Sequence, residues 1–145
     1  MLYHQTIKHP DSEEWVVFLH GAGGSSGVWY KQIRAYSKQF NLLLIDLRGH
    51  GQSALMAKST SEYNFRNIAG EVIEVLDANG LKGCHFVGLS LGTVIIREIL
   101  EIDPSYVKSM ILAGAIIKFS FRSRFLSKLA DIVKGHIPYM WLYRI

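Results

Sequence analysis

A serine lies between two glycines at the point where an apolar run of the sequence ends. The stretch Gly88-Leu89-Ser90-Leu91-Gly92 fits G-x-S-x-G, with a predicted strand before it and a predicted helix after it. A serine on so sharp a turn needs a strained backbone, and glycines two residues away on either side remove side chains that would collide with neighbouring backbone. The helix N-terminus stabilises negative charge, so the pattern suits a nucleophile whose attack on an ester creates an oxyanion. The alternative is that the glycines only allow close packing and Ser90 is a helix N-cap.

A second glycine-rich loop, residues 20–24 (HGAGG), follows the apolar run at 15–19. Such a loop can aim backbone N–H groups at one point, where they would bind a phosphate or complete an oxyanion hole. The dinucleotide pattern G-x-G-x-x-G fails here at its third position, which is Ser26. Asp46 nevertheless stands where a ribose-binding acid would stand, so a nucleotide-binding α/β domain remains an alternative.

Strand-like and helix-like segments alternate along the chain, and together they must position these loops. The expected strands are nearly all apolar, which is typical of strands buried on both faces of a parallel sheet. The sequence therefore predicts an α/β protein with a doubly wound, mostly parallel sheet and its ligand at the carboxyl ends of the strands. We expect strands at 15–19, 41–47, 84–89 and 107–115, a weakly signalled strand at 2–7, a loop at 48–62, and helices at 26–39, 64–79 and 91–102. The first helix has Ser25 or Ser26 as its candidate N-cap. The second ends at Asn79-Gly80 and has one apolar face, which consists of Ile68, Val72, Val75 and Leu76.

Three motifs, FLHGAGGSSGVW, DLRGHGQS and VGLSLG, occur in an order and spacing that resemble the α/β-hydrolase superfamily. The likeness spans residues from about 15 to 117 and is greatest to the small esterase, perhydrolase-like and C–C hydrolase branch. It implies that Ser90 is the nucleophile and that the backbone N–H groups of Ala22 and Leu91 hold the oxyanion. Serine at this turn argues against the branches that use aspartate there.

The resemblance gives the other motif residues a shaping role rather than a catalytic one. It implies a small acyl or ester substrate and neither a metal nor an organic cofactor. The shaping residues are His20, Gly21, Gly88, Gly92, Asp46, Arg48 and His50.

The chain offers no persuasive base for the serine. In this family the acid and then the histidine follow the serine, and the only histidine after Ser90 is His136. The acids after the serine are Glu98, Glu101, Asp103 and Asp131. We therefore expect residues 1–117 to be the N-terminal half of a hydrolase core, residues 118–145 to begin its lid, and the triad acid and histidine to lie outside the chain. A non-catalytic small-molecule-binding module is the alternative function.

The chain has 145 residues and a net charge of +4, and its basic character lies at the C-terminal end. Residues 118–145 hold six of the 16 Lys and Arg residues but one acid, Asp131. The amphipathic segment 118–134 is predicted to be a cap helix; contact with a membrane surface is the less favoured interpretation. Few basic residues and no recognition motif argue against nucleic-acid binding. A single cysteine, Cys84, and a polar N-terminus without a signal core predict a cytoplasmic protein.

Overall fold

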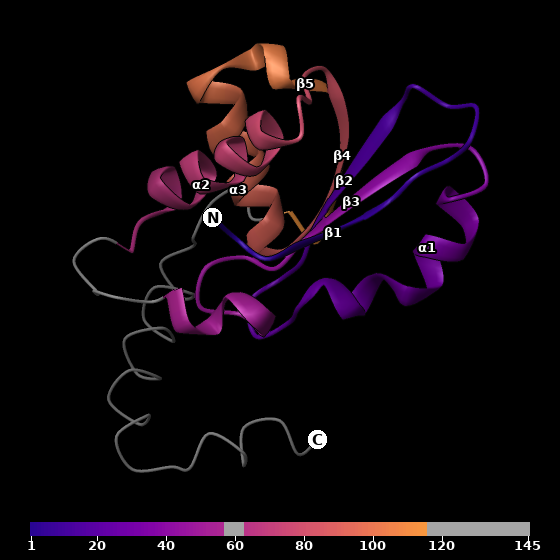
Figure 1. Ribbon diagram of the computed structural model, residues 1–145. Coiled ribbons are helices and arrows are strands. Elements are labelled where there is room, and N and C mark those ends of the chain that lie inside the picture. The colour runs from indigo at the N-terminus through magenta and orange to yellow at the C-terminus, as the bar shows by residue number, and fades with distance from the viewer. Residues whose placement is uncertain (57–62, 116–145) are drawn as a thin grey trace. The chain divides into compact units, whose positions relative to one another are not determined.

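Five strands form one sheet in the part of the chain that the structure describes. This computed structural model describes residues 1–56 and 63–115, and all of them lie within the compact unit Met1–Ala115. The strand order is β1-β3-β2-β4-β5 (Figure 1). Strand β1 pairs with β3 antiparallel, and the remaining pairs are parallel. The strands are β1 (His4–Ile7), β2 (Trp15–Leu19), β3 (Asn41–Ile45), β4 (Cys84–Leu89) and β5 (Val107–Ala113).

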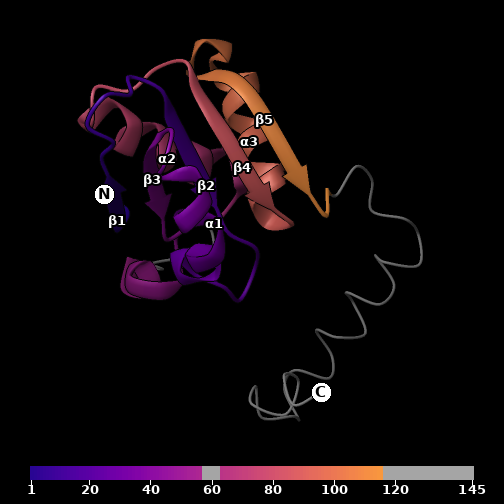
Figure 2. The same ribbon diagram turned by 90° about the vertical axis from the view of Figure 1, so that its right-hand side faces the viewer.

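Helices lie on both faces of this sheet. Helices α2 and α3 cover one face and α1 covers the other (Figures 1 and 2). The prediction of a doubly wound, mostly parallel α/β sheet is therefore confirmed. The α-helices are α1 (Tyr30–Tyr36), α2 (Phe65–Ala78) and α3 (Leu91–Ile102), and the 3-10 helices are η1 (Ser26–Trp29), η2 (Gly51–Met56) and η4 (Pro104–Tyr106).

The central strand β2 shows why its sequence is apolar throughout. Val17 and Leu19 belong to the core under α2 and α3, whereas Val16 and Phe18 belong to the core under α1. All four are buried. On the α1 side the ring of Phe18 lies 5.1 Å from that of Trp29, centroid to centroid. Because alternate side chains of a strand point to opposite faces, a strand covered on both sides must be apolar at every position.

Helix α2 follows its sequence signals closely. Asn64 caps it, with the side-chain oxygen accepting the amide of Asn67 at 2.8 Å. The predicted apolar face is fully buried. The helix stops at Asn79-Gly80, where Gly80 has φ +67°. The buried face consists of Ile68, Val72, Val75 and Leu76.

The single helix expected at 26–39 is wrong in detail. The segment begins as η1 and continues as the shorter α1, which ends at Tyr36. Ser25 has the extended backbone of an N-cap, yet its side chain makes no capping bond. The amide of Ser26 is instead bound by the carboxylate of Asp46 at 2.6 Å. The loop expected after 47 likewise contains a helical segment, η2.

The other elements lie close to their predicted ranges. Strand β4 and helix α3 match theirs, while β5 ends at Ala113, before Gly114 with φ +61°. The predicted cap helix at 118–134 lies outside the described residues. Among the described helices, none is long and apolar enough to cross a membrane. The loops after β2, β3 and β4 gather at the carboxyl edge of the sheet, because these three strands are neighbours and parallel.

Candidate active site

Ser90 has the backbone conformation that the sequence pattern predicts. Its φ is 47° and its ψ is −105°, and within residues 1–56 and 63–115 no other non-glycine residue has a positive φ. Such a conformation costs on the order of 1–3 kcal/mol and persists only where the surroundings enforce it. The Ser90 side chain makes no capping bond to α3. The N-cap interpretation therefore does not account for this residue.

Hydrogen bonds on both sides hold the strained turn in place. The Ser90 amide donates to the carbonyl of Ala113, the last residue of β5, at 2.9 Å. The Ser90 carbonyl accepts the amide of Thr93 at 3.0 Å and the Thr93 hydroxyl at 2.6 Å. The backbone polar groups of Ser90 are thus bound by its neighbours, while its side chain is half-buried at the start of α3.

The two flanking glycines are required by close backbone contacts. A Cβ on Gly88 would lie 2.5 Å from Cδ1 of Ile96 and 2.9 Å from the carbonyl carbon of Gly92. A Cβ on Gly92 would overlap the carbonyl oxygen of Leu19 and lie 2.8 Å from its carbonyl carbon. Backbone atoms cannot move aside as a flexible side chain can. Both glycines therefore let α3 start against β2 and β4, and so fix the turn between them.

The glycine loop after β2 lies directly beside the serine. A Cβ on Gly21 would contact Cβ of Ser90 at 3.4 Å. The loop then turns, with the Gly24 amide donating to the Gly21 carbonyl at 3.1 Å and Gly23 at φ +74°. Ala22 is exposed on this turn, and none of the described residues accepts a hydrogen bond from its amide. The structure thus brings the predicted oxyanion loop and Ser90 together.

His20 is completely buried at the root of this loop. Its Nδ1 lies 2.7 Å from the Gly21 carbonyl and must donate to it, while Nε2 accepts the amide of Leu47 at 3.0 Å. Both ring nitrogens are therefore engaged by backbone, and the ring is neutral. Burial lowers the pKa of His20, although the Gly21 carbonyl acts in the opposite direction. This histidine is held too firmly to act as a base for the serine.

Asp46, at the end of β3, is also buried and ties two loops together. Its Oδ1 accepts the Ser26 amide at 2.6 Å and its Oδ2 accepts the Gln52 amide at 2.8 Å. Burial alone would raise the pKa of Asp46, but the hydrogen bonds from Ser26 and Gln52 outweigh it and the pKa lies below its ordinary value. A carboxylate that is 2% exposed cannot reach a ribose, which argues against the nucleotide-binding alternative.

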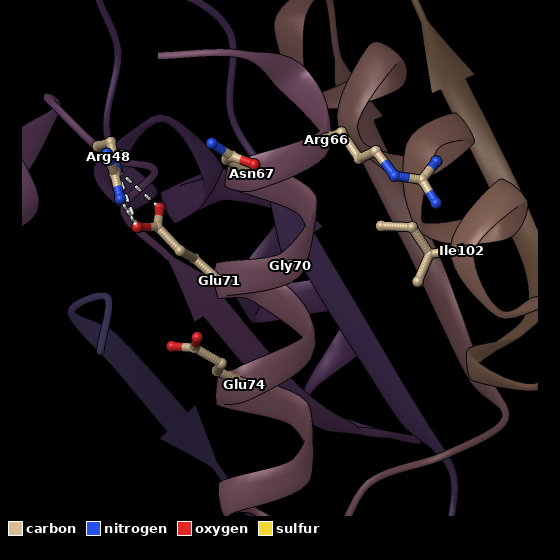
Figure 3. Close-up of a pocket in the computed structure, with 7 residues that line it drawn as sticks. All are labelled: Arg48, Arg66, Asn67, Gly70, Glu71, Glu74 and Ile102. Atoms are coloured by element: carbon tan, nitrogen blue, oxygen red, sulfur yellow. Dashed lines mark hydrogen bonds and ion pairs between the residues drawn. The ribbon is translucent and has the colours of Figure 1, made fainter. Parts of the chain in front are cut away.

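Arg48 and His50, in the loop after β3, are held by several contacts. The Arg48 Nε donates to both carboxylate oxygens of Glu71 on α2, at 2.8 and 3.0 Å (Figure 3). The Arg48 carbonyl accepts from His50 Nδ1 at 2.9 Å and from the Tyr63 hydroxyl at 2.8 Å. The His50 ring lies 5.2 Å from that of His20, centroid to centroid. The shaping role that the sequence predicts for both residues stays a prediction.

An open surface depression of about 490 Å³ lies over the outer face of α2. In Figure 3 the Arg48–Glu71 pair lies on one side of the helix, and Arg66 and Ile102 lie on the other. Neither Ser90 nor the glycine loop lines it. Its lining residues are Arg48, Arg66, Asn67, Gly70, Glu71, Glu74 and Ile102.

The acids after the serine do not form a triad with it in the described part of the chain. Asp103 caps η4, accepting the Ser105 amide at 2.9 Å, and lies 3.8 Å from Lys82 Nζ. Glu98 and Glu101 are on α3, and neither forms a hydrogen bond or ion pair with any described residue. His136 and Asp131 lie outside the described residues. The described residues also contain no cluster of three side chains that could bind a metal.

The chain belongs to the alpha/beta hydrolase fold family, whose sequence profile matches residues 14–142. It is 33% identical over 86 residues to 3-oxoadipate enol-lactonase 1 of Acinetobacter baylyi, covering 59% of this chain and 31% of that protein. It is 32% identical over 104 residues to the pimeloyl-[acyl-carrier protein] methyl ester esterase of Methylococcus capsulatus, covering 72% and 38%. Its homologues are thus hydrolases and esterases of this fold.

Solved structures agree on the fold. An esterase from Exiguobacterium antarcticum superposes with a TM-score of 0.78 at 23% identity, covering 93% of this chain and 52% of that one. The chain thus spans about half of this esterase, and between 31% and 47% of the first three curated relatives it matches.

Proposed function

We propose that this chain carries the nucleophile and the oxyanion hole of a serine hydrolase that acts on carboxylic esters or related acyl compounds. One observation supports it above the others: Ser90 has a strained, positive-φ backbone at the start of α3, with the glycine loop against it. The names of the relatives, an enol-lactonase and a methyl ester esterase, support an ester as the substrate class.

In the proposed reaction, Ser90 Oγ attacks the acyl carbonyl carbon and a base removes the hydroxyl proton. The amides of Ala22 and Leu91 stabilise the oxyanion, and the leaving alcohol departs with that proton. Water then attacks the acyl-enzyme, transfers a proton to the base and releases the acid. The chemistry calls for no metal and no organic cofactor.

The base and its acid are proposed to lie outside this sequence. Both nitrogens of His20 are bound to backbone, and His50 donates to the Arg48 carbonyl. The division into a core at 1–117 and the start of a lid at 118–145, a cytoplasmic location, and the preference for a cap over a membrane-binding segment at 118–134 all stay predictions. Isolated, the 145-residue chain is expected to show little turnover.

Labelling with a fluorophosphonate probe tests the proposal, because the probe forms a covalent bond with an activated serine hydroxyl. We would label a lysate of the native source and identify the adduct by peptide mapping. The proposal expects an adduct on the Ser90 peptide, in a protein of about twice this chain's mass, and its loss in Ser90→Ala. Ser105→Ala is the matched control, because Ser105 is exposed and also close to α3.

The main alternative is a non-catalytic module that binds a small molecule at the same edge of the sheet. It is favoured by one observation: none of the described residues supplies Ser90 with a base. It expects a protein at this chain's own mass, saturable binding of a ligand and no adduct on Ser90. That outcome would overturn the hydrolase proposal.

A further inference from the structure

The loops after β2 and β3 are linked by an exchange of hydrogen bonds in both directions. His20, at the end of β2, accepts the amide of Leu47 in the loop after β3, at 3.0 Å. Asp46, at the end of β3, accepts the amide of Ser26 beyond the loop after β2, at 2.6 Å. Each strand thus ends in a side chain that holds the loop of its neighbour. All three side chains are buried: His20 at 0%, Ser26 at 8% and Asp46 at 2% exposed.

We propose that His20 and Asp46 act together as positioning residues that fix the oxyanion loop, and with it the Ala22 amide, beside Ser90. This inference rests on the proposed function for its chemical meaning, since a fixed Ala22 amide matters only if an oxyanion forms there. The link itself is a structural statement about the two loops and can be tested without turnover.

The oxyanion loop needs such a link because few hydrogen bonds within the loop fix its conformation. Residues 21–25 include three glycines, and the Gly24-to-Gly21 bond is the sole backbone bond that closes their turn. The loop is anchored instead at its two ends. His20 Nδ1 binds the Gly21 carbonyl at 2.7 Å, and Asp46 binds the Ser26 amide. A donor amide acts in catalysis only if it is already in place, so fixing both ends has a direct chemical use.

The link depends on one protonation state of each side chain. A protonated His20 would direct an N–H at the Leu47 amide and lose that bond. Asp46 must offer one acceptor oxygen to Ser26 and another to Gln52, whereas asparagine has a single acceptor oxygen. Space is restricted as well, because a Cβ on Gly51 would lie 2.6 Å from the carboxyl carbon of Asp46.

The Asp46→Asn variant tests the link, with Asp103→Asn as its matched control. Asp103 also accepts a backbone amide, that of Ser105, but on η4, away from the loop. In the full purified chain we would measure amide hydrogen exchange at Gly24 and Leu47, neither of which bonds to Asp46. The proposal expects exchange at both to rise at least tenfold in Asp46→Asn, with exchange in α3 and β5 unchanged. It expects neither amide to change in Asp103→Asn.

A second variant keeps the test decisive if Asp46→Asn fails to fold. Ser26→Pro removes both groups of Ser26 that bind Asp46, the N–H and the side-chain hydroxyl, and leaves the carboxylate. It fits the backbone, because Ser25 before it is extended at φ −153° and proline suits the first position of a helix. Unchanged exchange at Gly24 and Leu47 in both variants, or an equal rise throughout the sheet, would overturn the proposal.

The rate of fluorophosphonate labelling of Ser90, measured in the longer native protein in which the base is proposed to lie, separates positioning from mere stability. Because removing an oxyanion donor outright costs about 100-fold or more, a displaced donor is expected to slow labelling about tenfold in Asp46→Asn and Ser26→Pro. If wild-type Ser90 takes up no probe, the proposed function fails while the exchange data still decide the link. If Ser90 is labelled equally fast in wild type and both variants, the positioning role fails and the proposed function stands.

Discussion

The two edges of the sheet each place a serine among polar groups, in opposite ways. At the carboxyl edge, Ser90 has a strained backbone and a glycine loop beside it, but no histidine partner among the described residues. At the amino edge, Ser109 Oγ lies 2.7 Å from His85 Nδ1, and His85 Nε2 lies 3.2 Å from Glu14 Oε2. The amino edge thus has the order of side chains found in a catalytic triad, Ser–His–Glu, but not the strained backbone turn at the serine.

The comparison shows that the backbone turn of a serine site requires a special sequence, whereas its side-chain hydrogen bonds do not. Ser109 is an exposed residue in the regular strand β5 and has no positive φ. The Glu14 carboxylate also binds Lys108 Nζ at 2.5 Å, so it interacts with both His85 and Lys108. Polar side chains on neighbouring strands meet in this way without any special sequence, and exposed pairs contribute little energy. The turn at Ser90, by contrast, needs a glycine on each side. The sequence therefore specifies the arrangement at the carboxyl edge and not the one at the amino edge.

Replacing one glycine at each edge should produce the largest difference in stability between the two edges. Gly92→Ala places a Cβ against the Leu19 carbonyl and should lower the free energy of unfolding by about 3 kcal/mol. Gly83→Ala, just before β4, meets nothing within 4 Å and bears the strain of φ +62° alone, about 1 kcal/mol. Urea denaturation measures both. Equal losses would mean that the close approach at Gly92 is not specific to the carboxyl edge.

Replacing one histidine at each edge should give the next largest effect. His20→Gln leaves a buried backbone amide or carbonyl without its partner, and should cost about 2 kcal/mol. His85→Gln removes a half-exposed ring from surface contacts and should change stability by less than about 0.5 kcal/mol. Thermal and urea unfolding of the two variants, compared with wild type, provide the measurement.

Acid should reduce the contribution of each edge to the stability of the fold, in a separate pH range for each. The pKa of His20 lies below its ordinary value of 6.5, chiefly because it is buried, so the unfolded chain takes up this proton first and stability falls as the pH drops below 6.5. The Lys108 hydrogen bond lowers the pKa of Glu14 below 4.5, so its contribution is present above 4.5 and is lost as the pH falls through the folded value.

Salt distinguishes these two contributions. Glu14 is exposed and its part should shrink in high salt, whereas the buried His20 part should persist. Urea midpoints measured from pH 7 down to about pH 2.5, at low and high salt, would show this. A decline between pH 6.5 and 5 that remains in His20→Gln would contradict the assignment.

Removing the amino-edge hydroxyl should have the smallest effect. Ser109→Ala should leave fluorophosphonate labelling of Ser90 within twofold of wild type, because its hydrogen bond to His85 lies at the other edge. No adduct is expected on the Ser109 peptide, since Ser109 lies in a regular strand and, among the described residues, has neither a strained turn nor a glycine loop beside it. An adduct on Ser109 in a Ser90→Ala background would reverse the comparison, making side-chain partners more important than backbone strain.

The sequence predicted well those features that depend on local pattern. The period of Ile68, Val72, Val75 and Leu76 located α2 and its buried face, and G-x-S-x-G located the strained turn. Both signals arise within a few residues of where they act. The family membership followed from three short motifs, and the parallel sheet from the alternation of apolar strands with helices.

The sequence could not predict features that depend on partners far along the chain. Helix 26–39 was expected to begin with a serine cap, but the Ser26 amide binds Asp46, which directly follows strand β3. The pairing of His20 with Leu47 is likewise invisible until β2 and β3 lie side by side. Seeing that His20 and Asp46 each follow an apolar strand would have suggested proximity, though not which amide each would bind.

The hydrogen bond from the Ser90 amide to the Ala113 carbonyl determines when during folding the strained turn becomes fixed. The strained turn is closed by the last residue of β5, and β2 gains its second neighbour only when β4 is present. A chain emerging from the ribosome through β4 therefore carries its serine without the carbonyl that restrains it. Contacts between such distant segments form late in folding. Reactivity should consequently not appear before the fifth strand joins, so that no form lacking β5 has a competent serine.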